Sequence, residues 1–306
     1  MTALHEAIAD YLALRRALGF KLDKHDRLLA DFVDYLEHTG TSTITIDAAL
    51  AWAIKPTTAQ PIRWRARLCV VRGFARYLHA VDPTAQVPPV DLLPHRHHRP
   101  TPYLFSPGDI TALLAATSRI RSPLRAATFE ALFGLLAATG MRVGEAIRLE
   151  DTDVDLTAGL LTVRETKFGK SRRLPVHPTT AAALRHYARE RDRLARRPRT
   201  TASFFVSTAG TRLIYTGVAA TFRRLVTAAG IGSTASPRIH SLRHTFAVAT
   251  LLAWYRDGGD VQARLPLLSA YLGHSHPNST YWYLQAAPEL LALAGTRLEH
   301  PREVLR

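Results

Sequence analysis

The chain contains very little cysteine. Cys69 is the single cysteine among 306 residues, so no intramolecular disulfide can form, and one chain cannot supply a thiolate metal cluster. Cys69 is flanked by Leu68, Val70 and Val71, and we expect it to be a small buried apolar residue rather than a reactive thiol.

Long hydrophobic runs are absent as well. No apolar segment approaches the roughly 18–20 residues that cross a bilayer, and the N-terminus has neither the basic start nor the apolar centre of a secretory signal. The sequence also lacks an acidic cluster with two-metal spacing and a Walker-type glycine loop, which argues against metal nucleases and ATPases. We therefore expect a cytoplasmic protein that uses no membrane partner, no metal and no other cofactor.

Acidic residues are too few to balance the basic ones. The chain has 40 Lys+Arg and 25 Asp+Glu, a formal net charge of +15. Such an excess favours a polyanionic partner, because phosphates that are neutralised by a protein release their condensed counterions. Residues 1–90 hold 11 basic and 9 acidic residues, so most of the excess lies farther along the chain. Composition thus favours nucleic acid as the partner without indicating what is done to it.

Residues 1–82 are predicted to form a helical domain. Apolar residues recur at helical spacing over residues 4–18 and again over 28–36. A short third helix is expected after Asp47, and a fourth over about 61–79. This last segment carries five arginines and no acid, so we predict that it contacts DNA phosphates, although a solvated basic face has the same pattern. The five are Arg63, Arg65, Arg67, Arg72 and Arg76.

A proline-rich linker is predicted over residues 83–104. Its prolines exclude a continuous helix and favour an extended connector. The run His95-Arg96-His97-His98-Arg99 could suggest a metal site, but a linker offers no fixed ligand geometry. We expect this run to be a basic strap that lies on DNA, and we place the second domain at residues 105–306.

The second domain is predicted to be mainly α-helical with a small antiparallel β-sheet. Between residues 152 and 176 the apolar pattern changes to a period of two, with turns expected at 157–159 and 168–170. Helices are expected after Ser106 and over 124–138, 178–195, about 214–228, 241–256 and about 264–272.

Four segments of this domain place polar groups in apolar surroundings. Arg142 lies between Gly140 and Gly144, and Lys167 lies at the tip of the expected hairpin. The spacing in His240-Ser241-Leu242-Arg243 puts the histidine and the second arginine on one helix face. The sequence Leu272-Gly273-His274 is followed nine residues after the histidine by Tyr283. Taken singly, each has an ordinary explanation: Arg142 could pair with Glu145 in the interior, and Tyr283 could be a core aromatic.

Taken in order, these segments resemble the tyrosine recombinase family, also called the phage integrase family. Residues 138–149, 166–176, 240–243 and 272–283 match its sequence boxes. The resemblance implies an N-terminal helical core-binding domain over 1–82 and a C-terminal integrase-like catalytic domain over 105–306. It implies six catalytic residues: Arg142, Lys167, His240, Arg243, His274 and Tyr283.

Neighbouring residues compete with two of these assignments. Tyr281 lies two positions before Tyr283, and Lys170 lies three positions after Lys167. The spacing from His274 favours Tyr283, and we favour Lys167 as the hairpin lysine. Pro277 lies where the family often enters a helix more smoothly, which leaves the register of that loop open.

The residue types fit a phosphodiester exchange that needs no metal. Arginine forks suit the nonbridging phosphate oxygens, and His274 adds another donor to them. Tyr283 is expected to be the nucleophile, with His240 as the base and Lys167 as the general acid that protonates the leaving 5′ oxygen. Such an attack leaves a 3′-phosphotyrosyl link, and rejoining then requires no ATP.

The resemblance also implies partners. These are double-stranded DNA recombination sites, bound by a homotetramer on two duplexes. The tail from about residue 287 is expected to dock either on a neighbouring protomer or on its own chain. Integration, excision, transposition of a mobile genetic element, inversion and dimer resolution all remain open. Two other functions fit the scaffold: a noncatalytic DNA-binding regulator and a type IB topoisomerase.

Overall fold

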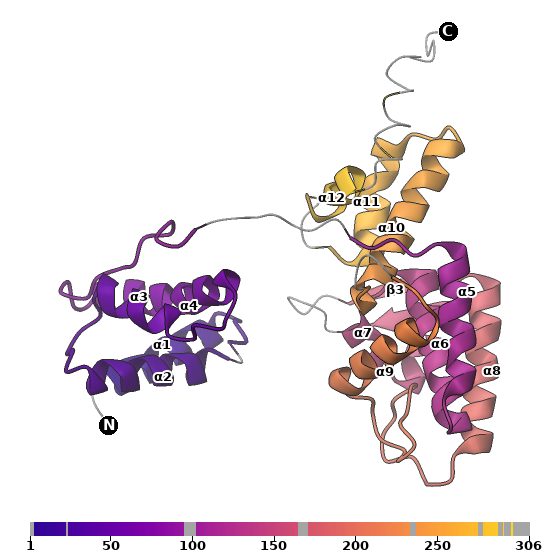
Figure 1. Cartoon of the computed structure of the whole chain (residues 1–306), viewed down its shortest axis with the longest axis horizontal. Coiled ribbons are helices and arrows are strands. Elements are labelled where there is room, and N and C mark those ends of the chain that lie inside the picture. Colours follow the sequence, from indigo (N-terminus) through magenta and orange to yellow (C-terminus); the bar gives the residue numbers. More distant parts are fainter. Residues whose placement is uncertain are drawn as a thin grey trace. The chain divides into compact units, whose positions relative to one another are not determined.

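A computed structural model gives the fold of the chain over residues 3–22, 24–94, 102–164, 171–232, 237–274 and 278–286, together with residues 290 and 295. The chain divides into two compact units, Met1–Arg99 and Pro100–Arg306 (Figure 1). None of the helices within the described ranges combines the length and apolarity that crossing a membrane requires.

In the part of unit 1 that the structure describes, four helices form a bundle: α1 (Ala3–Ala17), α2 (His25–His38), α3 (Ile46–Ile54) and α4 (Pro61–His79). The start of α3 is fixed by Thr45, whose side chain accepts a hydrogen bond from the Ala48 backbone N–H at 3.1 Å. Phe32 and Trp52 pack edge to face at 5.1 Å in the core of this unit. The buried apolar faces of the four helices therefore meet in one core.

The prediction that Cys69 is buried is wrong. Cys69 is exposed, because the inner face of α4 is formed by Leu68, Val71 and the residues that follow them at helical spacing. One residue step turns a helix by about 100°, which moves Cys69 off that face. Its side chain lines an apolar groove together with Trp64 and Leu93.

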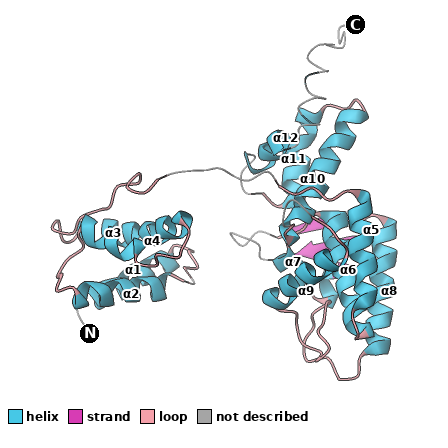
Figure 2. Cartoon of the chain, viewed as in Figure 1, coloured by secondary structure: helices cyan, strands magenta, loops and turns pink. Residues whose placement is uncertain are grey.

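Unit 2 is mainly helical with one small sheet, as the sequence predicts (Figure 2). Strands β1 (Val154–Asp155), β2 (Leu160–Val163) and β3 (Arg172–Pro175) are antiparallel and lie in the order β1-β2-β3. Leu161 and Leu174 are paired across β2 and β3 and are both buried. The alternation of these strands thus places one face of the sheet against the core.

Helices form most of the remaining described residues of unit 2. The first group is α5 (Pro107–Ala115), α6 (Pro123–Thr139), α7 (Val143–Arg148) and α8 (Pro178–Leu194). The second group is α9 (Tyr215–Ala228), α10 (Ile239–Arg256), α11 (Val261–Leu272) and α12 (Asn278–Ala286). Helix α6 packs against α8 and α10 and lies at the centre of the main core, while α10, α11 and α12 contact one another (Figure 1).

Two glycines end the helices that approach the candidate site. Gly140 caps α6 with φ +60°, and Gly273 caps α11 with φ +69°, a left-handed conformation that favours glycine. A Cβ atom on Gly140 would lie 2.6 Å from Cδ1 of Phe246. Both glycines therefore allow a sharp helix end and a close approach by a neighbouring side chain.

Candidate active site

Arg142 is placed at the start of α7 by Glu145. The Arg142 backbone N–H donates to Oε2 of Glu145 at 3.1 Å, and Nη1 of the guanidinium donates to Oε1 at 2.9 Å. The remaining Nη2 donates to the Gly273 carbonyl at 3.2 Å. The Arg142 side chain is 39% exposed while that of Glu145 is 3% exposed. The buried carboxylate thus holds a guanidinium that keeps an open face.

Arg243 lies near the start of α10 and is almost completely buried. Its Nη1 donates to the Gly140 carbonyl at 2.8 Å, and its Nη2 donates to the Leu272 carbonyl at 2.9 Å. Burial lowers the pKa of Arg243, and interaction with the Tyr283 phenol opposes this shift. The Arg243 guanidinium therefore links the end of α6, just before Arg142, to the end of α11.

The two arginines meet at one turn. Arg142 donates to the Gly273 carbonyl and Arg243 donates to the Leu272 carbonyl, so the two guanidinium groups are hydrogen-bonded to adjacent peptide units. The residue after this turn is His274. Segments that are about a hundred residues apart in the sequence are thereby brought to one point.

Two histidines flank the guanidinium groups. Nδ1 of His274 lies 2.7 Å from the Thr280 hydroxyl. Burial, followed by the positive charges of Arg243 and Arg142, lowers the pKa of His274 to about 4. His240 keeps an exposed edge, yet desolvation of its inner edge, followed by the charges of the same two arginines, lowers its pKa to about 4 as well. Both rings are therefore neutral at pH 7.

Tyr283 lies on α12 beside these groups. Its ring stacks on that of His274 with centroids 6.0 Å apart and meets the ring of His244 at 5.5 Å. The residue is 2% exposed, whereas Tyr281 is 44% exposed. Two positions on a helix differ by about 200°, so the two tyrosines point to opposite sides. Tyr283 is the one that faces the cluster.

Five of the six candidate catalytic residues are thus described and lie together, and Lys167 falls outside the described residues. The competing Lys170 and the proline at 277 fall outside them as well. Within the described ranges, no three side chains of His, Cys, Asp or Glu are grouped as a metal site would require.

Sequence reasoning missed one member of the cluster, Arg172. Its Nη2 donates to Oε2 of Glu145 at 2.8 Å, and its Nε donates to the Tyr271 carbonyl at 2.9 Å. A signal was present in the sequence. Residues two apart on a strand share a face, so Arg172 lies on the same inner face of β3 as the buried Leu174. The ordinary explanation for Arg142, an interior pair with Glu145, also describes a real contact.

The five arginines predicted to contact DNA do not have equal surroundings. Arg63 and Arg76 are exposed and Arg65 is partly exposed. The Arg67 guanidinium lies 3.7 Å from the Trp52 ring centroid and bonds to Asp31. Arg72 is buried, and it donates to the Pro88 and Pro89 carbonyls at 2.7 and 2.6 Å. Arg72 is therefore occupied inside unit 1.

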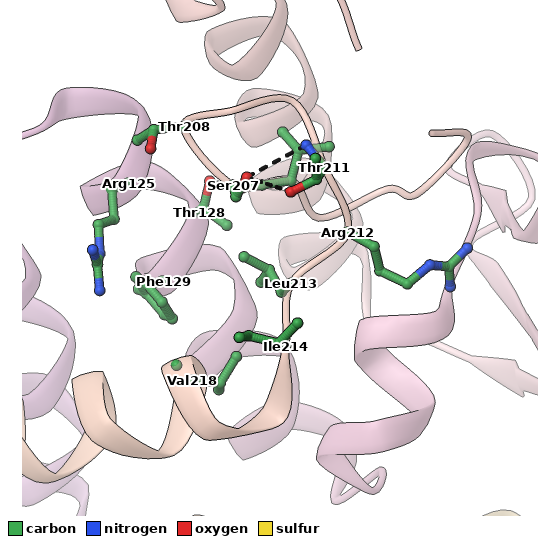
Figure 3. Close-up of a pocket in the computed structure, with 12 residues that line it drawn as sticks. Arg125, Thr128, Phe129, Ser207, Thr208, Thr211, Arg212, Leu213, Ile214 and Val218 are labelled. Atoms are coloured by element: carbon green, nitrogen blue, oxygen red, sulfur yellow. Dashed lines mark hydrogen bonds between the residues drawn. The ribbon is translucent and has the colours of Figure 1, made fainter. Parts of the chain in front are cut away.

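A separate pocket of about 260 Å³ lies between α6, the loop before α9, and α9 itself. Figure 3 shows Arg125 and Phe129 on one side of it and Ile214 on the other. The Ser207 hydroxyl lies 2.8 Å from that of Thr211. None of the described candidate catalytic residues lines this pocket. It is not part of the candidate active site.

Comparison with known proteins agrees with this geometry. The sequence profile of the phage integrase family matches residues 105–289. The chain is 45% identical to the putative integrase/recombinase y4rB of Sinorhizobium fredii over 98% of each chain. It is 27% identical to the tyrosine recombinase XerD of Oceanobacillus iheyensis over 92% of this chain and 93% of that protein.

A solved structure of similar fold is the Tn1549 transposon integrase in complex with transposon right end DNA. It matches with a TM-score of 0.70 and 16% identity over 99% of this chain and 100% of that chain. Residues 105–289, which the family profile matches, contain both arginines, both histidines and Tyr283. The chain belongs to the phage integrase family and is a tyrosine recombinase, an enzyme of site-specific DNA recombination.

Proposed function

We propose that this recombinase is of the integrase or transposase type and cleaves and rejoins DNA through a 3′-phosphotyrosyl link to Tyr283. One observation carries the proposal. Arg142 and Arg243 grip the adjacent carbonyls of Gly273 and Leu272, next to His274 and the Tyr283 ring. This arrangement gathers positive charge and a phenol at one point, as attack on a phosphodiester requires.

The scissile phosphate would be held by the guanidinium groups and His274. Arg142 has an open face, and a guanidinium fork matches two nonbridging oxygens at once. These groups stabilise the negative charge that develops in the transition state, so the reaction would need no metal. The base contacts that choose the target sequence belong to the rest of the DNA-binding surface.

The proton transfers follow from the remaining groups. The Tyr283 oxygen forms the new bond to phosphorus, the bond from phosphorus to the 5′ oxygen breaks, and His240 takes the phenolic proton. Lys167 gives a proton to the departing 5′ oxygen. The His240 pKa is lowered first by desolvation and then by the charges of Arg243 and Arg142. A bound phosphate would offset the part due to the two arginines, so DNA binding should strengthen this base. Because the phosphotyrosyl link retains the bond energy, rejoining would need no ATP.

Unit 1 would act as the core-binding domain. Its α4 presents Arg63 and Arg76 at the surface, with Arg65 partly exposed, and such residues suit contacts to the DNA backbone. We assign Arg67 and Arg72 mainly to packing within the unit. The similar XerH recombinase has been solved bound to its difH substrate, and we propose that this chain likewise binds recombination sites, as a homotetramer on two duplexes.

The decisive experiment traps the covalent intermediate. The purified full chain is incubated with sheared DNA of its host, the reaction is stopped with detergent, and the DNA that stays attached is sequenced. A nicked suicide duplex built from the recovered site should then attach to the wild type. Y281F is the matched control and should attach at a rate within a few-fold of wild type, whereas Y283F should bind the duplex without attaching.

Other outcomes would identify the rival functions. Binding of the duplex with no attachment by the wild type would indicate a noncatalytic regulator. Attachment without sequence preference, together with relaxation of arbitrary plasmids by the monomer, would indicate a topoisomerase. Attachment by Y283F at the wild-type rate would overturn the assignment of the nucleophile.

A further inference from the structure

Arg172 lies at the junction of three elements of the catalytic unit. It belongs to β3, its Nη1 and Nη2 reach the two carboxylate oxygens of Glu145 at 3.3 and 2.8 Å, and its Nε reaches the Tyr271 carbonyl in the last turn of α11. A Cβ atom on Gly273 would lie 2.6 Å from Arg172 Nη1. The guanidinium therefore packs directly against the turn that carries His274.

Glu145 is shared by two arginines. Oε1 accepts from Arg142 at 2.9 Å and from Arg172 at 3.3 Å, while Oε2 accepts from the Arg142 backbone and from Arg172. Arg172 is the inner partner, with a side chain 13% exposed against 39% for Arg142. Burial raises the pKa of Glu145, but the hydrogen bonds and charge of Arg172, followed by those of Arg142, outweigh it and leave that pKa lowered. The carboxylate is thus held ionised chiefly by Arg172.

The charge balance depends on this arrangement. Arg142 and Arg172 are paired with Glu145, and Arg243 interacts with the same carboxylate through its charge alone. Three positive charges against one negative charge leave two positive charges for a bound phosphate. Without Arg172, the buried carboxylate of Glu145 would be satisfied by Arg142 alone. Arg142 would then form a neutral pair, and its open face would be drawn inward, because a buried charge needs a partner.

We propose that Arg172 is a positioning residue of the recombination reaction: by neutralising Glu145 and holding the last turn of α11, it frees the charge of Arg142 for the scissile phosphate. This inference rests on the proposed phosphotyrosyl mechanism. Arg172 itself need not touch the DNA, because its hydrogen bonds are directed to Glu145 and Tyr271.

A methylphosphonate substrate separates this role from a merely structural one. Replacing one nonbridging oxygen of the scissile phosphate by a methyl group removes its negative charge. R172M keeps much of the side-chain length but loses the charge, and R173M makes the same change one residue along β3, where the side chain is exposed. Single-turnover attachment is measured for each protein at saturating DNA, with the phosphate and methylphosphonate forms of the recovered site.

R172M should attach to the phosphate substrate about 100-fold more slowly than wild type, the magnitude seen when a charge-stabilising donor is lost. On the methylphosphonate, its rate should fall by less than about 10-fold, because less charge has to be stabilised. R173M should match wild type on both. Equal losses on the two substrates, or no loss on the phosphate, would overturn the proposal.

If R172M does not fold, the E145Q background decides the question. Removing the carboxylate charge removes the need to neutralise it, so R172M/E145Q should attach within about 10-fold of E145Q alone, because the two changes are coupled. A loss of about 100-fold in that background would contradict the coupling. Absence of attachment by the wild type would defeat the proposed mechanism itself, whereas attachment by wild type and R172M alike would defeat only the role of Arg172.

Discussion

His274 is neutral in the folded protein at a pH where a free histidine is largely protonated. Its pKa is lowered from 6.5 to about 4. Between these values the unfolded chain binds more protons than the folded one, so the stabilisation is full above pH 6.5 and is lost as the pH falls toward 4. We expect unit 2 to lose on the order of 1 kcal/mol through this residue between pH 7 and pH 5, after allowance for its partial exposure.

The variant H274N isolates this effect. Urea unfolding at pH 7 and pH 5 should show a smaller loss of stability for H274N than for wild type, because asparagine does not titrate in this range. A loss of equal size in both proteins would show that His274 does not have a lowered pKa.

Gly140 is required both by its backbone and by its neighbour. Its φ is +60°, and an added Cβ would lie 2.6 Å from Phe246. Gly159 provides the matched control, since its φ is +66° but the nearest atom to an added Cβ is the Val176 carbonyl oxygen at 3.4 Å. We expect G140A to lower the free energy of unfolding by about 3 kcal/mol and G159A by about 1 kcal/mol.

Thermal unfolding of the two variants measures this difference. G140A should also weaken DNA attachment, because the Gly140 carbonyl accepts a hydrogen bond from Arg243. Equal shifts in melting temperature would mean that Phe246 moves aside at little cost.

The arginines of helix α4 are of two kinds: some are packed within unit 1 and others are exposed. Arg72 is buried against the Pro88 and Pro89 carbonyls, whereas Arg76, one turn later, is exposed. R72A should destabilise unit 1 by about 2–4 kcal/mol, because it leaves two acceptors without their donor. R76A should leave stability unchanged and reduce the salt dependence of DNA binding by about one phosphate contact.

Melting curves and binding isotherms over a range of salt concentrations test both halves of this expectation. The assignment of α4 as a DNA contact would be wrong if R76A bound DNA with the same affinity and salt dependence as wild type. A stable R72A would show that its two carbonyl contacts are dispensable.

The elements were largely predictable from local pattern. Apolar spacing predicted α4 at 61–79, and the switch to a period of two predicted the small sheet. The orientation of single side chains was harder. The sequence of α4 does not show which of its arginines binds the carbonyls of residues 88 and 89. That contact depends on the path of the loop that follows the helix.

In the catalytic unit as a whole, some residues of the candidate site could be predicted from the sequence and others could not. Its sequence boxes singled out Arg142, His240, Arg243, His274 and Tyr283, because those residue types are unusual in their surroundings. Arg172 was missed because its meaning comes from tertiary contacts with Glu145 and Tyr271, which are distant in the sequence. Lys167 remains a prediction, since it lies outside the described residues.

The central claim is that these distant segments assemble around one phenolic oxygen, that of Tyr283. Mass spectrometry of the covalent protein–DNA adduct tests it most directly, after the DNA has been digested to a short remnant and the protein to peptides. We predict that the fragment spectra place the added phosphodiester on Tyr283, with the DNA attached through its 3′ end. Attachment at Tyr281, at Tyr271 or at a serine would contradict the account.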